Sequence, residues 1–168
     1  MNPSLVGSEM CIRDRQWGGG QEADLRAGTL PTPLIVGFAA AVQEAMADRD
    51  ERHKRLAGLR DRLWNGLNDQ LPAVERNGAA APRLAHNLNI TLLGMSGSRL
   101  HRSLRPHLAC SSGSACSNGA PSHVLQALGR SRADAEASLR LSLGRSTTEN
   151  AVEQAIATIV EAVAAQQS

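Results

Sequence analysis

The side chains most suggestive of chemistry lie in residues 109–121, which read Ala-Cys-Ser-Ser-Gly-Ser-Ala-Cys-Ser-Asn-Gly-Ala-Pro. Small, turn-forming residues of this kind are typical of an exposed loop, and loops on a rigid scaffold often carry function. Cys116 lies among small residues rather than among the Val, Leu and Ile that surround a buried structural cysteine. We therefore expect the sulfur of Cys116 to be accessible. Cys110, at the end of a short strand predicted over 108–110, is expected to be a packed thiol.

A second candidate is an arginine in a predicted strand. Leu139, Leu141 and Leu143 alternate with Arg140 and Ser142, and this period of two places the leucines on one face and the arginine on the other. The planar guanidinium group suits recognition of a carboxylate. The alternative is a surface arginine on a half-exposed sheet.

Composition excludes several classes of protein. The 168 residues carry a formal net charge of +2, which gives no general electrostatic attraction for nucleic acid. Three cysteines do not make a disulfide framework, and no apolar run reaches the roughly 18 residues of a membrane span. We expect a cytoplasmic protein. Lys54 is the only lysine and lies in a charged stripe, which predicts an exposed position.

Two other functions would use the same region differently. His107, Cys110, Cys116 and His123 have the right chemistry for zinc, but they lack the closely spaced cysteine pair of structural zinc sites. The segment could also belong to a non-catalytic interaction domain, with its glycines and serines serving only as loop residues.

The elements that must position these side chains can be predicted from periodicity. Residues 16–32 form a Gly-rich segment, and a long helix is predicted over 33–72, opened by Pro33. The helix would bury one face made of leucines at three- and four-residue spacing, namely Leu56, Leu59, Leu63 and Leu67.

Residues 79–168 alternate between strand and helix patterns, which predicts an α/β small domain. Strands are expected over 88–92 and 139–143, and helices over 98–105 and 122–128. Ser146 and Glu149 have the spacing of a capping box ahead of a closing amphipathic helix.

Three motifs together resemble one family. Ser-Ser-Gly-Ser-Ala-Cys at 111–116, Gly-Gly-Gly-Gln-Glu with Leu-Arg-Ala-Gly-Thr within 18–29, and Leu-Arg-Leu-Ser-Leu-Gly-Arg at 139–145 resemble segments of the NifS/IscS-like cysteine desulfurases. These are pyridoxal-phosphate enzymes of the class V aminotransferase superfamily. The resemblance runs from about residue 17 to the end. This stretch is similar to the C-terminal part of such an enzyme. Residues 1–15 are interpreted as a non-native or disordered leader.

The resemblance implies a fold and a set of roles. The fold would be the C-terminal part of a fold-type I pyridoxal-phosphate enzyme. Cys116 would receive sulfur from L-cysteine as a persulfide, with L-alanine as the other product, and Arg140 would bind the substrate carboxylate. Thr29 would contact the cofactor phosphate held by the other subunit of a homodimer. The persulfide would pass to an iron–sulfur scaffold or sulfur-carrier protein. The Schiff-base lysine would lie outside these residues, so the chain alone is expected to be inactive.

Overall fold

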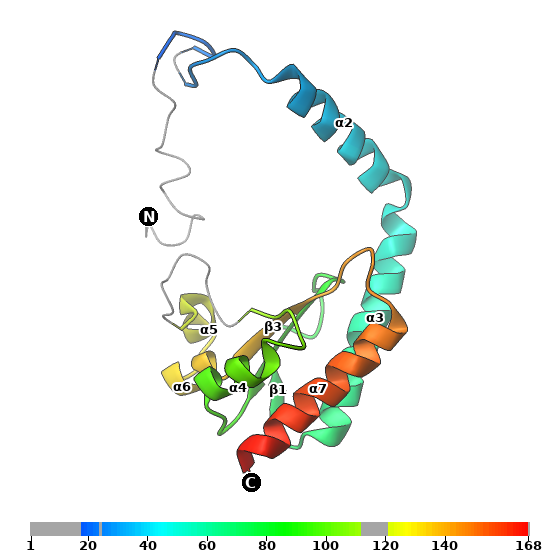
Figure 1. The fold of residues 1–168 in the computed structure, drawn as a ribbon, viewed down its shortest axis with the longest axis vertical. Helices are drawn as coiled ribbons and strands as arrows, with labels where there is room; N and C mark the ends of the chain where they lie inside the picture. The colour runs from blue at the N-terminus through cyan, green and yellow to red at the C-terminus, as the bar shows by residue number, and fades with distance from the viewer. Residues whose placement is uncertain (1–17, 24, 112–120, 168) are drawn as a thin grey trace. The chain divides into compact units, whose positions relative to one another are not determined.

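The computed structural model describes residues 18–23, 25–111 and 121–167, and it divides the chain into two compact units, Met1–Asp48 and Arg49–Ser168 (Figure 1). In the first unit a short loop precedes helix α2, Thr32–Ala47, which has Pro33 in its first turn as predicted. The loop is held locally, because the Arg26 guanidinium donates to the carbonyl of Gly28 at 3.0 Å and Gln21 Oε1 accepts from the Gly28 N–H at 3.0 Å.

The single helix predicted over 33–72 is wrong. The helical backbone is interrupted at Asp48, where φ is −119° and ψ is 16°, and helix α3 then runs over Arg49–Gln70. The Asp48 N–H bonds to the carbonyl of Met46, two residues back, so the α-helical pattern of bonds four residues apart stops there.

Helices α3 and α7 (Glu149–Gln167) pack side by side in the second unit and contribute much of its core (Figure 1). Leu56, Leu59, Leu63 and Leu67 are buried, which confirms the face predicted for α3. Gly66 allows the two helices to approach closely, since a Cβ at that position would lie 2.5 Å from Ile156 Cδ1. The glycine that weakens α3 by its own propensity is therefore the residue that permits this contact.

The core rests on a three-stranded antiparallel sheet with the order β1-β2-β3, formed by Val74–Arg76, Asn87–Leu92 and Ser138–Ser142. β2 and β3 confirm the two predicted strands. β1 is too short to show an alternating pattern in the sequence. The register of β2 on β3 places Leu88 opposite Leu141 and Ile90 opposite Leu139, and all four side chains are buried.

Three short helices complete the second unit. α4, Gly97–Leu104, and α5, His123–Ala127, confirm the predicted helices, and Gly129 follows α5 with a positive φ of 92°. α6, Arg132–Glu136, was not predicted. Its first turn is capped by Ser131, whose Oγ accepts from the Asp134 N–H at 3.1 Å.

The predicted capping box is wrong by two residues. α7 begins at Glu149, and Thr148 Oγ1 accepts from the Ala151 N–H at 3.1 Å, so Thr148 is the N-cap in place of Ser146. The turn before α7 is held by local bonds between Gly144 and Thr147 and also by a residue far away in the sequence. The Arg55 guanidinium on α3 donates to the carbonyls of Arg145 and Thr147 at 2.9 and 2.8 Å, which holds these residues in a turn.

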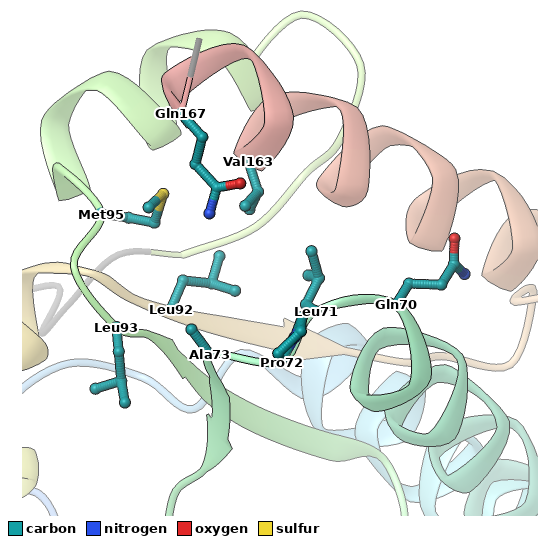
Figure 2. A pocket seen from close by; sticks show the side chains of 9 residues that line it. All are labelled: Gln70, Leu71, Pro72, Ala73, Leu92, Leu93, Met95, Val163 and Gln167. Atoms are coloured by element: carbon teal, nitrogen blue, oxygen red, sulfur yellow. The ribbon is translucent and has the colours of Figure 1, made fainter.

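A cavity of about 250 Å³ lies between the C-terminal ends of α3 and α7 and the adjoining ends of β1 and β2 (Figure 2). Apolar side chains make up most of its wall, together with the amide side chains of Gln70 and Gln167. It has no titratable side chain in its lining, so it offers no acid, base or nucleophile for catalysis.

No helix in the described part of the chain is long and apolar enough to span a membrane.

Candidate active site

The sheet has one apolar face and one polar face, and Arg140 lies on the polar face. The leucines of β3 are buried in the core while Arg140 is exposed, as the alternation predicted. The register places Arg140 opposite Asn89, Ser138 opposite Thr91 and Ser142 opposite Asn87. Within the described residues the Arg140 guanidinium has no hydrogen-bond or ion-pair partner. An exposed, unpaired guanidinium on an ordered strand is available to bind an anion.

The backbone of Arg140 is also joined to the start of the cysteine-containing segment. The Arg140 N–H donates to the carbonyl of Ser111 at 2.8 Å, and the Ser111 N–H donates back to the carbonyl of Arg140 at 3.2 Å. This pairing is an isolated bridge, so the strand predicted over 108–110 is wrong. Among the described residues of 109–121, Ser111 is the one that pairs with β3.

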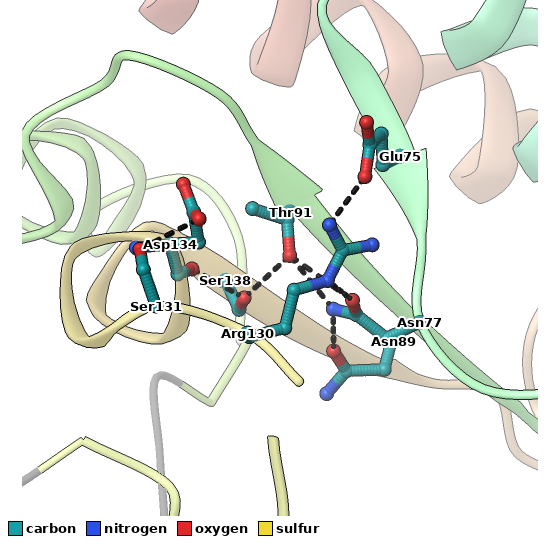
Figure 3. A network of polar contacts seen from close by, with 8 residues as sticks. All are labelled: Glu75, Asn77, Asn89, Thr91, Arg130, Ser131, Asp134 and Ser138. Carbon is teal, nitrogen blue, oxygen red and sulfur yellow. Dashed lines mark hydrogen bonds and ion pairs between the residues drawn. The ribbon is translucent and has the colours of Figure 1, made fainter. Parts of the chain in front are cut away.

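A network of buried polar groups lies at the covered end of the polar face (Figure 3). Thr91 Oγ1 and Ser138 Oγ are 2.8 Å apart, and both residues are almost fully buried. Asn77 Nδ2 donates to Thr91 Oγ1 at 2.9 Å and to Asn89 Oδ1 at 2.7 Å. Ser138 Oγ in turn donates to the carbonyl of Asp134 at 2.7 Å. The network therefore links β2, β3 and α6 to Asn77, the residue that follows β1.

Arg130 connects this network to the first strand. Its Nε donates to Asn77 Oδ1 at 2.6 Å, and its guanidinium forms an ion pair with Glu75 of β1 (Figure 3). Both oxygen and nitrogen of the Asn77 side chain are thus occupied, which fixes the orientation of its amide.

Cys110 packs against the core as predicted. Its Sγ lies 4.0 Å from Nδ1 of His101 on α4, and burial raises the pKa of the Cys110 thiol. Burial lowers the pKa of His101, opposed by a smaller effect of the Ser138 backbone, and His101 Nε2 is a buried atom with no hydrogen-bond partner in the described structure. A thiol with a raised pKa is a weak nucleophile at neutral pH.

The other two predicted site residues, Cys116 and Thr29, lie outside the described part of the second unit. Cys116, the predicted nucleophile, lies outside the described residues, as does the predicted leader, residues 1–15. Thr29 belongs to the first unit, where its side chain is exposed and its carbonyl accepts from Arg26 at 3.4 Å.

The zinc alternative finds no support in the part of the chain that is described. His107, Cys110 and His123 are described, and no group of three or more His, Cys, Asp or Glu side chains there could hold a metal ion. His107 and His123 are both exposed.

Comparison with known proteins identifies the class of protein to which this fold and polar face belong. The family model described as aminotransferase class-V matches residues 1–155. The chain therefore belongs to the class V aminotransferase family, as its motifs predicted.

Among curated proteins, the similarity is to cysteine desulfurases. The chain is 43% identical over 148 residues to Cysteine desulfurase IscS of Shewanella piezotolerans, covering 87% of this chain and 36% of that protein. It is 44% identical over 141 residues to Cysteine desulfurase IscS of Dechloromonas aromatica, covering 83% of this chain and 34% of that protein. The chain thus spans about a third of the length of these relatives.

Among solved structures, the similarity is to NifS-like proteins. A NifS-like protein superimposes with a TM-score of 0.74 at 30% identity, covering 88% of this chain and 38% of its own. The NifS-like protein from Rickettsia africae gives a TM-score of 0.77 at 27% identity, covering 88% of this chain and 39% of its own. The predicted α/β fold of a NifS-like pyridoxal-phosphate enzyme is confirmed.

The residues of this chain supply only part of what the family's cofactor needs. Class V aminotransferases and their IscS and NifS members depend on pyridoxal phosphate. A Schiff-base lysine needs a desolvated pocket, and Lys54, the only lysine, is exposed on α3. These residues therefore do not supply the covalent attachment. What they offer is an exposed guanidinium, that of Arg140, with no hydrogen-bond or ion-pair partner among the described residues.

Two neighbours of Arg140, Asn89 and Ser111, were missed in the sequence. Asn87, Asn89 and Thr91 alternate with buried apolar residues, which marks a polar face. The alternation does not reveal which residue of this face lies opposite Arg140, because that depends on strand register.

Proposed function

We propose that this chain forms part of a cysteine desulfurase in which Arg140 binds the carboxylate of L-cysteine and Cys116 receives its sulfur. The observation that carries the proposal is the exposed guanidinium of Arg140, free of partners among the described residues and joined through its backbone to Ser111. Ser111 is followed five residues later by Cys116. The similarity to cysteine desulfurases of known sequence supports the same assignment.

The proposed reaction is balanced without a further oxidant or reductant. The Cys116 thiolate attacks the sulfur of the substrate, an S–S bond forms, and the bond between the substrate Cβ and its sulfur breaks. The electron pair of that bond stays on the Cβ, which takes up a proton to give L-alanine. Pyridoxal phosphate supplies the electron sink that weakens the bond. Arg140 orients the amino acid through a two-pronged contact with its carboxylate.

The remaining assignments also rest on the family resemblance. Thr29 contacts the cofactor phosphate across a homodimer interface, and a scaffold or sulfur-carrier protein takes the persulfide for iron–sulfur cluster or thio-cofactor assembly. The exposed position of the Thr29 side chain, beside carbonyls already held by Arg26, is compatible with such a contact. A cytoplasmic location remains a prediction from composition.

The test uses the chain joined to the preceding part of a cysteine desulfurase relative, with formation of L-alanine and of protein persulfide as readouts. C116S removes the sulfur acceptor and should abolish both products. R140Q removes a charged contact worth about 2 kcal/mol, which would raise KM for cysteine about 30-fold. C110S is the matched control and should retain activity. Unchanged alanine formation by C116S would exclude the proposed role of Cys116.

A further inference from the structure

We propose that Asn89 is a second residue that binds the substrate carboxylate, by donating from its side-chain amide beside the Arg140 guanidinium. This inference rests on the proposed function of Arg140. The register pairs Asn89 on β2 directly with Arg140 on β3. Directly opposed residues of an antiparallel pair share a face, with Cβ atoms about 4.5–5.5 Å apart. Their polar groups can therefore reach one small ligand together.

The orientation of the Asn89 amide is set by its hydrogen bond to Asn77 in the buried polar network. Asn77 Nδ2 donates to Asn89 Oδ1 at 2.7 Å, so the oxygen of Asn89 faces the buried network (Figure 3). Asn77 cannot turn easily, because its own Oδ1 accepts from Arg130 Nε and its Nδ2 also bonds to Thr91. This arrangement leaves the Asn89 nitrogen as the group not engaged by the network.

That nitrogen is available to a ligand. Within the described residues, the only side-chain hydrogen bond of Asn89 is the one its oxygen accepts. Asn89 is half-buried rather than enclosed, and its Nδ2 is absent from the buried atoms without partners in this part of the chain. The amide nitrogen is therefore both open and unpaired.

The chemistry of the pair selects the ligand. Arg140 offers only donors, and the Asn89 amide presents its donor end beside them. Two adjacent donor groups match the two oxygens of a carboxylate and give nothing to an amine or a cation. A hydrogen bond to a charged group is worth about 1.5–3 kcal/mol, which corresponds to a factor of about 10 to 100 in affinity.

The test compares two ligands that differ only in the carboxylate, L-alanine and ethylamine. Calorimetry measures the dissociation constant of each with the chain joined to the preceding part of a cysteine desulfurase and loaded with cofactor. N89A should lower the preference for L-alanine over ethylamine about tenfold. N87A is the matched control, since Asn87 lies on the same strand and face but opposite Ser142, and it should change the preference less than twofold.

The variant N89D covers the case in which N89A fails to fold. The aspartate keeps an oxygen for Asn77 and places a negative charge where the amide nitrogen was, so it should weaken L-alanine binding more than N89A does. Equal losses for L-alanine and ethylamine in N89A, or unchanged L-alanine binding in N89D, would overturn the role of Asn89.

R140Q separates this inference from the proposed function. If R140Q lowers the preference for L-alanine while N89A and N89D do not, the Asn89 assignment alone fails. If R140Q leaves the preference unchanged, the carboxylate site itself has been misplaced and both proposals fail.

Discussion

Ser111 and Arg140 are joined by two backbone hydrogen bonds, the N–H of each donating to the carbonyl of the other. Ser111, which lies five residues before Cys116, is therefore fixed to the residue proposed to hold the substrate. The apolar face of β3 is buried, so this pairing extends the sheet at its exposed edge without disturbing the core.

Removing one of these bonds should impair sulfur transfer. S111P eliminates the N–H that donates to Arg140, whereas S111A keeps both backbone groups. We expect S111P to lower the rate of persulfide formation on Cys116 several-fold more than S111A, measured by labelling of the persulfide in the enzyme joined as above. Equal rates in the two variants would show that the bridge has no part in the reaction.

Two glycines of the same helix should respond in opposite directions to alanine. A Cβ at Gly66 would lie 2.5 Å from Ile156 Cδ1, and a Cβ at Gly58 would have nothing within 4 Å. G66A should lower the free energy of unfolding by about 1–3 kcal/mol through overpacking. G58A should raise it by about 0.5–1 kcal/mol because alanine favours the helix. Urea denaturation of the 168-residue chain measures both, and a stabilising G66A would contradict the close contact of α3 with α7.

The start of α7 can be located by a pair of cap variants. Thr148 Oγ1 accepts from the Ala151 N–H, so T148A should cost about 1 kcal/mol. S146A should change the free energy of unfolding by less than about 0.5 kcal/mol, as for most exposed residues. A larger loss in S146A than in T148A would restore the capping box expected from the sequence.

The buried imidazole of His101 should make stability depend on pH. Burial lowers its pKa in the folded state below the ordinary value of 6.5, so the unfolded chain binds more protons over that range. The free energy of unfolding should therefore be highest above pH 6.5 and fall as the solution is made more acidic. H101Q lacks the titrating group, and its stability should vary less between pH 5 and pH 7. An equal slope in H101Q would assign the pH dependence to other groups.

Reactivity of Cys110 provides a separate check on the same packing. Because burial raises the pKa of its thiol, less thiolate is present at a given pH than in a free cysteine. In the chain carrying C11S and C116S, alkylation of Cys110 should be slower than alkylation of a cysteine-containing peptide at pH 8. Denaturant should remove the difference.

Sequence patterns could predict the elements whose side chains repeat over several turns or pleats. The leucines of α3 and the alternation in β2 and β3 are of this kind, and so is the outward position of Arg140. β1 could not be predicted in this way, because its three residues do not make a pattern. The break at Asp48 carries no proline or glycine to signal it.

The features that sequence patterns did not predict involve contacts between residues far apart in the chain. The turn that precedes the cap of α7 is held partly by Arg55, which donates to the carbonyls of Arg145 and Thr147 from about 90 residues away. The Asn89–Arg140 pair follows from strand register, which the alternation of β2 and β3 does not specify on its own. The role of Cys116 was predicted from its small neighbours and from the resemblance of its motif, and its position lies outside the described residues.

The division at Asp48 has a practical consequence for handling the protein. Every buried apolar side chain described belongs to the second unit, while the exposed large apolar residues of α2 include Leu34, Val36 and Phe38. An exposed apolar surface of this kind promotes aggregation during purification. A shortened gene that starts at Arg49 would retain the whole described core and the Ser111–Arg140 bridge while discarding that surface, and it should stay monodisperse at higher concentration.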